Sequence, residues 1–249
     1  MLVDAGADGK VLGCLSKHMP IGDVTLEIAV VTHADIDHFK GFNSVFNTYL
    51  VGEVWLVSLD KDTTDFTQFK QLLARKLDVG TRLRMLNQGD VFSFKDIVTI
   101  SVLWPKISAE DSAETILSDA NLVLNSKKKW ENDLSIVLKV QIFDQVVLLT
   151  GDIESGAEQA LLAADLISDV EVLKVAHHGS KTSTTDLFLE RTQPEIAAVS
   201  SGVNNQHGHP TEEIIAKITD VGAIILRTDQ LSTFGLLFER GKGIEILKN

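Results

Sequence analysis

Residues 33–38 of this chain, His-Ala-Asp-Ile-Asp-His, place two imidazoles and two carboxylates within six positions. Imidazole nitrogens and carboxylate oxygens bind zinc at about 2.0–2.2 Å, and they also bind manganese and iron. A single His-x-Asp pair is common in surface loops, whereas four such residues in six positions are typical of a metal site. The alternative, a helix N-cap formed by Asp37, accounts for only one of the four. We therefore predict that His33, Asp35, Asp37 and His38 bind metal.

This segment lies where a predicted strand ends and a predicted helix begins. Residues 26–31 are apolar and rich in β-branched side chains, which indicates a buried strand, and apolar residues recur at helical spacing from Phe39 onward. Side chains at 33, 35 and 37 alternate along the turn, so we expect them to converge on one point. Loops at the ends of buried strands are common positions for functional residues, because the strands hold them rigidly.

Three later segments repeat this arrangement of a buried strand followed by ligand-type residues, namely 148–152, 172–180 and 199–210. Their ligand-type residues are Asp152, His177, His178, His207 and His209. Asp152 alone can be a turn or cap residue, the His177–His178 pair can be one core and one exposed histidine, and we interpret His207 as a plain loop residue. Taken together, the set is large enough for two metals with one carboxylate bridging, about 3.5–4 Å apart.

The remaining pattern predicts an α+β protein of stacked sheets, a four-layer αββα sandwich, as a single domain over 1–249. Strands and helices alternate from residue 155 onward, and an amphipathic helix is predicted over 65–77. We expect the stretch up to residue 23 to be mostly loop. The chain begins directly on a predicted strand, which favours either a missing preceding strand or a sheet edge completed in another way. Residues 107–124 are polar and are interpreted as a possible lid or insertion.

Composition limits the function classes. The formal net charge of −12 argues against a protein that grips duplex DNA broadly through its phosphates. The basic run Lys127–Lys129 is interpreted as an exposed turn or an anion-contacting loop. No apolar run approaches the roughly 20 residues of a membrane span, and the N-terminus does not resemble a signal peptide. The single cysteine, Cys14, excludes an intramolecular disulfide and fits a reducing compartment, so we expect a cytoplasmic protein without membrane partners.

Together these motifs resemble the metallo-β-lactamase superfamily, and in detail the hydrolase domain of the ComEC/Rec2 competence proteins and its free-standing relatives. The resemblance extends from residue 2 to beyond residue 229. It is carried by Leu2–Gly6, the 33–38 turn, Asn132–Ser135, Leu149–Asp152, Lys174–Ser183 and Gly208–Pro210. It implies the metallo-β-lactamase fold and a hydrolase that uses a hydroxide bridging two divalent ions, zinc, manganese or iron.

The chain departs from the superfamily pattern at one position. The usual first motif is His-x-His-x-Asp-His, and Asp35 stands where its second histidine would be. A carboxylate oxygen is a harder ligand than imidazole, which favours Mn²⁺, Fe²⁺ or Mg²⁺ over Zn²⁺. Residues 39–151 contain no histidine, so the central-strand histidine of the β-lactamases is missing, as it is in the competence-type members.

The resemblance implies a ligand set for each ion. It implies one ion bound by His33, Asp35 and Asp152, and a second bound by Asp37, His38 and Asp152. His178 and His209 would complete the two ligand sets, without a choice between the ions. The candidate catalytic residues are Asp37, His177 and His209, with Asp37 or His209 handling protons.

The resemblance also implies residues around the ligands. It implies that His177 and Ser180 contact the phosphate or a ligand. Asp4 would orient a ligand histidine, and Lys181 and Thr182 would hold an anionic group.

We therefore expect a metal-dependent hydrolase of phosphoesters, acting on a small-molecule or nucleic-acid phosphodiester. The first alternative is a lactone, thioester or β-lactam hydrolase on the same fold; the missing central histidine and Asp35 both weigh against a β-lactamase. The second alternative is a non-catalytic binding module with an incomplete metal site, against which the nearly complete ligand set weighs. The sequence predicts no particular oligomeric state.

Overall fold

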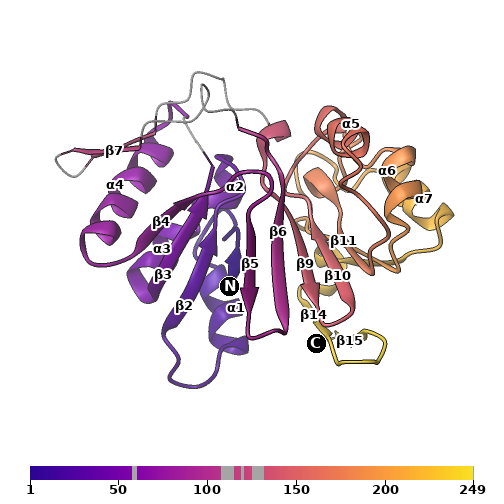
Figure 1. Cartoon of the computed structure of the whole chain (residues 1–249), viewed down its shortest axis with the longest axis horizontal. Coiled ribbons are helices and arrows are strands. Elements are labelled where there is room, and N and C mark those ends of the chain that lie inside the picture. Colours follow the sequence, from indigo (N-terminus) through magenta and orange to yellow (C-terminus); the bar gives the residue numbers. More distant parts are fainter. Residues whose placement is uncertain (58–60, 108–114, 119–120, 125–131, 249) are drawn as a thin grey trace. The chain divides into compact units, whose positions relative to one another are not determined.

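The computed structural model describes residues 1–57, 61–107, 115–118, 121–124 and 132–248 (Figure 1). The chain divides into two compact units: Met1–Asn87 with Lys106–Glu131 form the first unit, and Gln88–Pro105 with Asn132–Asn249 form the second unit. Mixed helix and strand content with several sheets confirms the α+β class. The expectation of a single domain over 1–249 stays a prediction.

The first unit is built on a four-stranded sheet in the order β1-β2-β3-β4, with every pairing parallel. Its strands are β1 (Leu2–Val3), β2 (Thr25–Val30), β3 (Leu50–Leu56) and β4 (Arg82–Met85). Its helices are α1 (Val11–His18), α2 (Ile36–Phe39), α3 (Phe42–Thr48) and α4 (Thr64–Asp78). Because parallel strands end at the same edge of a sheet, the residues that follow β1 and β2 lie together there.

Aromatic side chains join the helices of the first unit. Phe39 of α2 contacts Phe66 and Phe69 of α4, with ring centroids 5.2 and 5.4 Å apart, and Phe46 of α3 stacks near Phe69 at 6.1 Å. The four rings are fully buried or nearly so. The stripe predicted on the 65–77 helix is therefore confirmed as core, and it anchors the short helix α2 that carries the 35–38 part of the metal-type segment.

One expectation for the first unit is corrected, and one alternative is excluded. Residues 11–18 form α1 rather than loop, and all its residues stay at least partly exposed. The nearby glycines and Pro20 dominated the sequence pattern, whereas one glycine inside an exposed helix costs only about 1 kcal/mol. Asp37 is not a helix cap either, because the N-cap of α2 is Asp35.

The polar stretch 107–124 is described only in part. Residues 115–118 and 121–124 form a hairpin, β7 (Thr115–Ser118) with β8 (Asn121–Leu124), and β8 contacts α4. The rest of 108–131, including Lys127–Lys129, lies outside the described residues. Its interpretation as a lid or an anion-contacting loop stays a prediction.

The second unit is built on a seven-stranded sheet in the order β13-β12-β11-β10-β9-β6-β5. The pairings from β10 to β13 are parallel and those from β10 to β5 are antiparallel. The strands are β5 (Val91–Phe94), β6 (Val98–Trp104), β9 (Val137–Ile142), β10 (Gln145–Leu149), β11 (Val172–Lys174), β12 (Ile196–Val199), β13 (Ile224–Arg227), and a separate pair β14 (Phe234–Leu237) and β15 (Glu245–Lys248). The helices are α5 (Ser155–Ala163), α6 (Asp186–Thr192), α7 (Glu212–Asp220) and α8 (Thr228–Leu231), with 3-10 turns η1 (Asn132–Leu134) and η2 (Ala176–Gly179).

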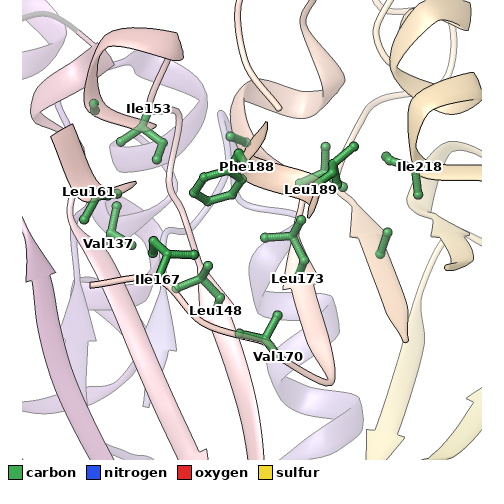
Figure 2. Packing of buried hydrophobic residues seen from close by; sticks show 14 of the residues in the cluster. Val137, Leu148, Ile153, Leu161, Ile167, Val170, Leu173, Phe188, Leu189 and Ile218 are labelled. Carbon is green, nitrogen blue, oxygen red and sulfur yellow. The ribbon is translucent and has the colours of Figure 1, made fainter. Parts of the chain in front are cut away.

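Alternate residues along the strands of this sheet face two different cores. Leu173 of β11 packs with Leu161 of α5 and Phe188 of α6 in the larger core (Figure 2). Its neighbour Val172 packs on the opposite face, where Phe234 of β14 is among the residues that cover it. The parallel part of the sheet, from β10 to β13, is thus covered on both faces, as is usual for parallel strands, and it holds the carboxyl ends of β10, β11 and β12 rigidly at one edge.

An ion-pair network of Glu53 with two exposed arginines in the first unit generates a prediction about acid stability. Hydrogen bonds from Arg84, and from Trp55 and Arg82, lower the pKa of Glu53 from 4.5 to about 2 although partial burial opposes the shift. Because the folded pKa lies below the unfolded one, this stabilisation is present above pH 4.5 and is lost as the pH falls toward 2. We expect Glu53→Gln to lower the free energy of unfolding by roughly 1 kcal/mol at neutral pH, after allowing for solvent screening.

Urea unfolding at about pH 7 and at about pH 3.5 measures this effect, and the difference between the two proteins shrinks at the lower pH. Glu27→Gln, on the neighbouring strand β2 and exposed, is the control and changes stability little at either pH. An equal loss for Glu53→Gln at both pH values contradicts the ionic explanation.

Candidate metal centre

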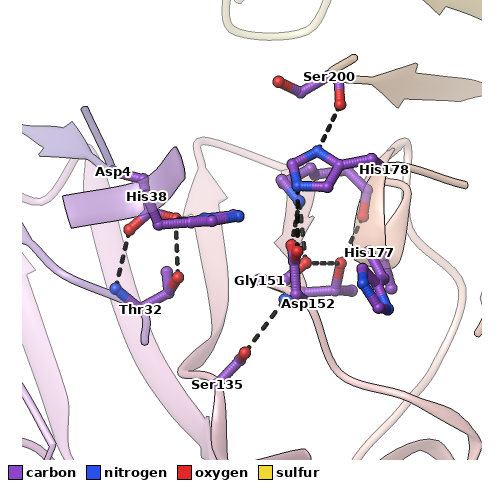
Figure 3. Close-up of polar contacts among 12 residues, drawn as sticks. Asp4, Thr32, His38, Ser135, Gly151, Asp152, His177, His178 and Ser200 are labelled. Carbon is purple, nitrogen blue, oxygen red and sulfur yellow. Dashed lines mark hydrogen bonds and ion pairs between the residues drawn. The ribbon is translucent and has the colours of Figure 1, made fainter. Parts of the chain in front are cut away.

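The Asp4 carboxylate orients His38 in the first unit. Asp4 follows β1, and its Oδ2 lies 2.7 Å from His38 Nδ1 (Figure 3). Burial opposes ionisation of Asp4, but His38 and the hydrogen bonds from His38 and Thr32 hold its pKa below the ordinary value. An ionised carboxylate only accepts hydrogen bonds, so His38 Nδ1 carries the proton and the lone pair of the ring is on Nε2. The expected contact between Asp4 and a candidate ligand histidine is therefore present.

Thr32 fixes the tautomer of His33 in the same way. Its N–H donates to Asp4 Oδ1 at 2.9 Å and its hydroxyl donates to Asp4 Oδ2 at 2.7 Å. With its only proton given to Asp4, the Thr32 oxygen 2.9 Å from His33 Nδ1 can only accept, so His33 is also protonated on Nδ1. The rings of His33 and His38 are buried, with centroids 4.0 Å apart. Both histidines therefore have the tautomer that offers Nε2 to a metal.

Gly41 allows this arrangement to form. A Cβ atom at Gly41 would lie 1.9 Å from the Ala5 carbonyl oxygen, so only glycine permits the start of α3 to approach the turn after β1. In the same place Ala5 N–H donates to the His38 carbonyl and Gly41 N–H donates to the Gly6 carbonyl, each at 2.8 Å. The backbone contact thus places the Asp4 turn against the helix that carries His38.

The two aspartates of the 33–38 segment differ in environment. Asp35 Oδ2 lies 3.9 Å from His33 Nε2, while its Oδ1 forms an ion pair with Lys61. Asp37 is half exposed, and its Oδ2 lies 3.9 Å from His38 Nε2. In the first unit, each imidazole Nε2 therefore has a carboxylate oxygen nearby, and the expected convergence of these side chains is observed to that extent.

Asp152 follows β10 in the second unit and is buried. Its backbone N–H donates to Ser135 Oγ at 3.2 Å, and Lys174 Nζ lies 3.6 Å from its Oδ1 while donating to the Gly151 carbonyl at 2.9 Å (Figure 3). Gly151 has φ +55°, and a Cβ there would lie 2.7 Å from the Ser135 Cβ. The Asn-Asp-Leu-Ser segment thus positions Asp152 through close backbone approach.

His178 is held by a backbone carbonyl. Its Nδ1 lies 2.6 Å from the Ser200 carbonyl oxygen, which only accepts, so the lone pair is again on Nε2 (Figure 3). That Nε2 lies 3.1 Å from Asp152 Oδ2. Two lone pairs at this distance repel unless a proton or a metal cation lies between them. The separation is close to the roughly 3.4 Å between two ligands of a tetrahedral zinc.

The turn that carries His177 and His178 has an unusual backbone. Both residues have positive φ, 46° and 55°, and Gly179 follows at 84°. A Cβ on Gly179 would lie 2.5 Å from the Pro210 Cβ, and Thr211 N–H donates to the Gly179 carbonyl at 3.0 Å. Close contact at Gly179 therefore joins this turn to the loop of His209.

His209 is partly buried, with its ring 5.7 Å from that of His177. Asn205 holds the loop, accepting from His209 N–H at 2.9 Å and donating to the His209 carbonyl. Burial lowers the pKa of His209, and the imidazoles of His177 and His178 lower it further. A neutral ring suits a metal ligand. His207 is exposed, as expected of a loop residue.

The donor set of each unit therefore fits a divalent cation. His33, His38 and His178 each give the Nδ1 proton to a protein acceptor and offer Nε2, the usual arrangement of metal-binding histidines. The oxygens of Asp4 already accept three hydrogen bonds, so we interpret Asp4 as an orienting residue although its oxygen and the two imidazole nitrogens lie within 4.8 Å of one another. The assignment of individual ligands to ions stays a prediction.

Several residues with a role in these arrangements were missed by sequence reasoning. They are Glu154, Lys61, Asn205 and Glu158. Glu158 is fully buried and accepts the backbone N–H groups of Thr184 and Thr185, beyond the histidine turn. Glu154, two residues after Asp152, and Asn205, four residues before its partner His209, carry a local signal, whereas the partners of Lys61 and Glu158 lie far away in sequence.

The Thr32 hydroxyl is expected to strengthen metal binding. Thr32→Val keeps the shape of the side chain but removes the acceptor for His33 and one donor to Asp4. We expect the affinity for Mn²⁺ or Zn²⁺ to fall about 10-fold or more, as for other residues that orient metal ligands. Thr32→Ser keeps the hydroxyl and should retain most of the affinity. Isothermal titration calorimetry measures both, and equal affinities for the Val and Ser variants contradict the role assigned to the hydroxyl.

Lys61 is expected to oppose metal binding at Asp35. Replacement by methionine removes the cation that occupies Asp35 Oδ1, so the affinity for Mn²⁺ should rise roughly 3- to 10-fold. Lys40→Met is a matched control, because Lys40 is 40% exposed and pairs with an aspartate, Asp65, as Lys61 at 39% does with Asp35. A rise of the same size in both variants indicates a general charge effect, and a fall for Lys61→Met contradicts the proposed competition.

The chain is similar in sequence to a ComE operon protein and to a competence protein. It is 29% identical over 222 residues to ComE operon protein 3 of Bacillus subtilis, covering 88% of this chain and 25% of that protein. It is 38% identical over 116 residues to competence protein ComA of Neisseria gonorrhoeae, covering 45% of this chain and 16% of that one. The chain thus spans a quarter or less of the length of these relatives. No protein-family model matches the chain.

Among solved structures, the chain is similar to Zn²⁺-bound PqqB from Methylobacterium extorquens, with a TM-score of 0.50 at 7% identity over 89% of this chain and 80% of that one. At this identity the likeness concerns the fold alone. PqqB has the metallo-β-lactamase fold. The predicted resemblance to the ComEC/Rec2 competence proteins, and with it the metallo-β-lactamase fold, is therefore confirmed.

Proposed function

We propose that this protein is a metal-dependent hydrolase of phosphoesters. The observation that carries the proposal is the common arrangement of His33, His38 and His178, each anchored at Nδ1 with Nε2 close to a carboxylate oxygen. Three imidazoles with the same tautomer rarely arise by chance, because each ring needs its own hydrogen-bond acceptor at Nδ1. The sequence motifs shared with the competence-type hydrolase domains support the same activity.

The residues that would hold two divalent ions are His33, Asp35, Asp37, His38, Asp152, His178 and His209. When bound, such ions provide Lewis acidity for the scissile ester and lower the pKa of a water molecule. The oxygen-rich set favours manganese or iron, with zinc as the other candidate. Lys174 Nζ lies 3.6 Å from Asp152 Oδ1, and Thr32 and Asp4 keep the first two histidines in the required tautomer.

Proton handling is assigned to Asp37 or His209. Asp37 is half exposed, so its carboxylate can exchange protons with solvent. His209 has a lowered pKa and is neutral near pH 7, which lets it accept a proton or bind a cation. The two roles are alternatives, and the variant whose metal-loaded form loses one limb of the pH profile of kcat distinguishes them.

The proposed substrate is a small-molecule or nucleic-acid phosphodiester. One relative is named a ComE operon protein and another a competence protein, and the chain covers only part of each, so any substrate of the whole relatives comes to this chain as a proposal. The net charge of −12 favours a short or single ester over broad contact with duplex DNA. Within the part of the chain that the structure describes, all helices are too short or too polar to cross a membrane. A cytoplasmic location is part of the proposal and rests on the single cysteine.

The direct test is hydrolysis of bis-p-nitrophenyl phosphate with added Mn²⁺ or Zn²⁺. We expect Asp37→Ala and Asp152→Ala to lose activity by at least about 100-fold, because each removes a charged ligand. Full activity in either variant refutes the assignment of that residue. Higher rates on lactone, thioester or β-lactam substrates than on phosphodiesters would instead support the alternative hydrolase.

Metal analysis separates both hydrolases from a binding module. We expect two ions per chain after loading with Mn²⁺, as the resemblance implies. Glu190→Ala, an exposed residue of α6, is the control and should keep both metal content and activity. Fewer than one ion per chain, without rescue by added Mn²⁺, would overturn the hydrolase proposal.

A further inference from the structure

His177 is anchored by side chains that sequence reasoning did not assign. Its Nδ1 lies 3.2 Å from Glu154 Oε1 and 3.4 Å from Thr182 Oγ1. The rings of His177 and His178 leave the same turn in different directions, with centroids 6.3 Å apart (Figure 3). His177 therefore has its own environment, distinct from the Ser200 carbonyl and Asp152 that hold its neighbour.

The proton on Thr182 decides the direction of these hydrogen bonds. Thr182 Oγ1 donates to Glu154 Oε1 at 3.0 Å, because the carboxylate has no hydrogen to give. Its single proton is thereby used, so toward His177 Nδ1 the hydroxyl can only accept. Both polar neighbours of Nδ1 are then acceptors, which requires the hydrogen of the neutral ring to be on Nδ1.

The opposite side of the ring agrees with this tautomer. Asn132 Nδ2, an amide donor, lies 3.5 Å from His177 Nε2. A donor at that position requires a lone pair on Nε2. Asn132, His177 and Glu154 thus form a chain of hydrogen bonds with one consistent direction, from the amide through the ring to the carboxylate.

The position of Glu154 in the fold also favours this role. Glu154 is the N-cap residue of α5, yet it makes no capping hydrogen bond with its side chain to the described residues of the helix. Its backbone N–H donates to Asp133 Oδ1 at 2.6 Å, and the Ser155 N–H donates to the Thr182 carbonyl at 2.9 Å. These contacts hold the start of α5 against the 180–183 loop and direct the carboxylate to His177.

We propose that Glu154 is a positioning residue that fixes His177 as a hydrogen-bond acceptor at Nε2. A ligand that replaces the Asn132 amide at Nε2 would then be a hydroxyl or water O–H, or an N–H group, rather than a phosphate oxygen, because the neutral ring has no hydrogen on Nε2 to donate. A phosphodiester that carries a neighbouring hydroxyl fits this requirement. The expected effect of Glu154 on catalysis rests on the proposed hydrolase function, whereas the assignment of the ring hydrogen of His177 to Nδ1 does not.

Long-range ¹H–¹⁵N NMR of the full-length protein at about pH 8.5, where neutral imidazoles predominate, shows which nitrogen of each histidine carries hydrogen. His177 is assigned by comparison with His177→Gln. We expect hydrogen on Nδ1 in the wild type. In Glu154→Met the carboxylate is lost and the Thr182 hydroxyl can donate to Nδ1, so a measurable fraction of the rings should carry hydrogen on Nε2, with the Asn132 amide opposing a complete shift.

Two further variants separate tautomer control from a merely structural effect. Glu154→Gln keeps an acceptor oxygen and should retain hydrogen on Nδ1, and Glu190→Met on α6 is the control for the added methionine. If the protein hydrolyses phosphodiesters, Glu154→Met should lower kcat about 10- to 100-fold with a smaller change in KM, and Glu154→Gln should restore most of it.

The outcomes are distinguishable. Hydrogen on Nε2 of His177 in the wild type overturns the inference, even if no variant folds. An unchanged tautomer in a folded Glu154→Met protein overturns it as well. Absence of phosphodiesterase activity in the metal-loaded wild type refutes the proposed function instead, and leaves the tautomer measurement as an independent test of Glu154.

Discussion

A neutral imidazole carries one hydrogen, and the position of that hydrogen decides which nitrogen can bind a metal. In this protein Asp4, Thr32 and the Ser200 carbonyl each accept an Nδ1 hydrogen, so the lone pairs of three histidines are on Nε2. The rest of the site depends on this constraint. Parallel strands matter because their carboxyl ends bring acceptor and histidine to the same edge of a sheet, as β1 and β2 do for Asp4 and His38.

The backbone has to be unusually close or strained for these acceptors to reach the rings. Gly41 and Gly179 lie where a Cβ would collide with the chain, and His177 and His178 have left-handed backbone angles that cost about 1–2 kcal/mol each for ordinary residues. Such strain persists only where surrounding packing holds it, and the large core beneath β10, β11 and α6 in the second unit serves that purpose. The packing of this core thereby maintains the backbone conformation of His177 and His178.

The sequence pointed to the candidate ligand residues because each follows a buried strand, a local pattern that needs no knowledge of the fold; their role as ligands stays a prediction. The aromatic stripe of α4 and the alternation of strands and helices after residue 155 were predicted from local patterns of the same kind. Pairs distant in sequence could not be predicted. Lys61 and Asp35 lie far apart in sequence and form their ion pair only in the folded protein. The glycines in and around residues 11–18 obscured the helical pattern of α1. Glu154 was missed although it is local, because its carboxylate could equally have capped α5.

The most direct test of the account is anomalous scattering from crystals of the protein loaded with Mn²⁺, with data collected on both sides of the manganese edge. The account predicts anomalous density within about 2.0–2.3 Å of the Nε2 atoms of His33 and His38, with Nδ1 of both rings still bound to Thr32 and Asp4. Density next to Nδ1 of either ring, or no density near these histidines in fully loaded crystals, would contradict it.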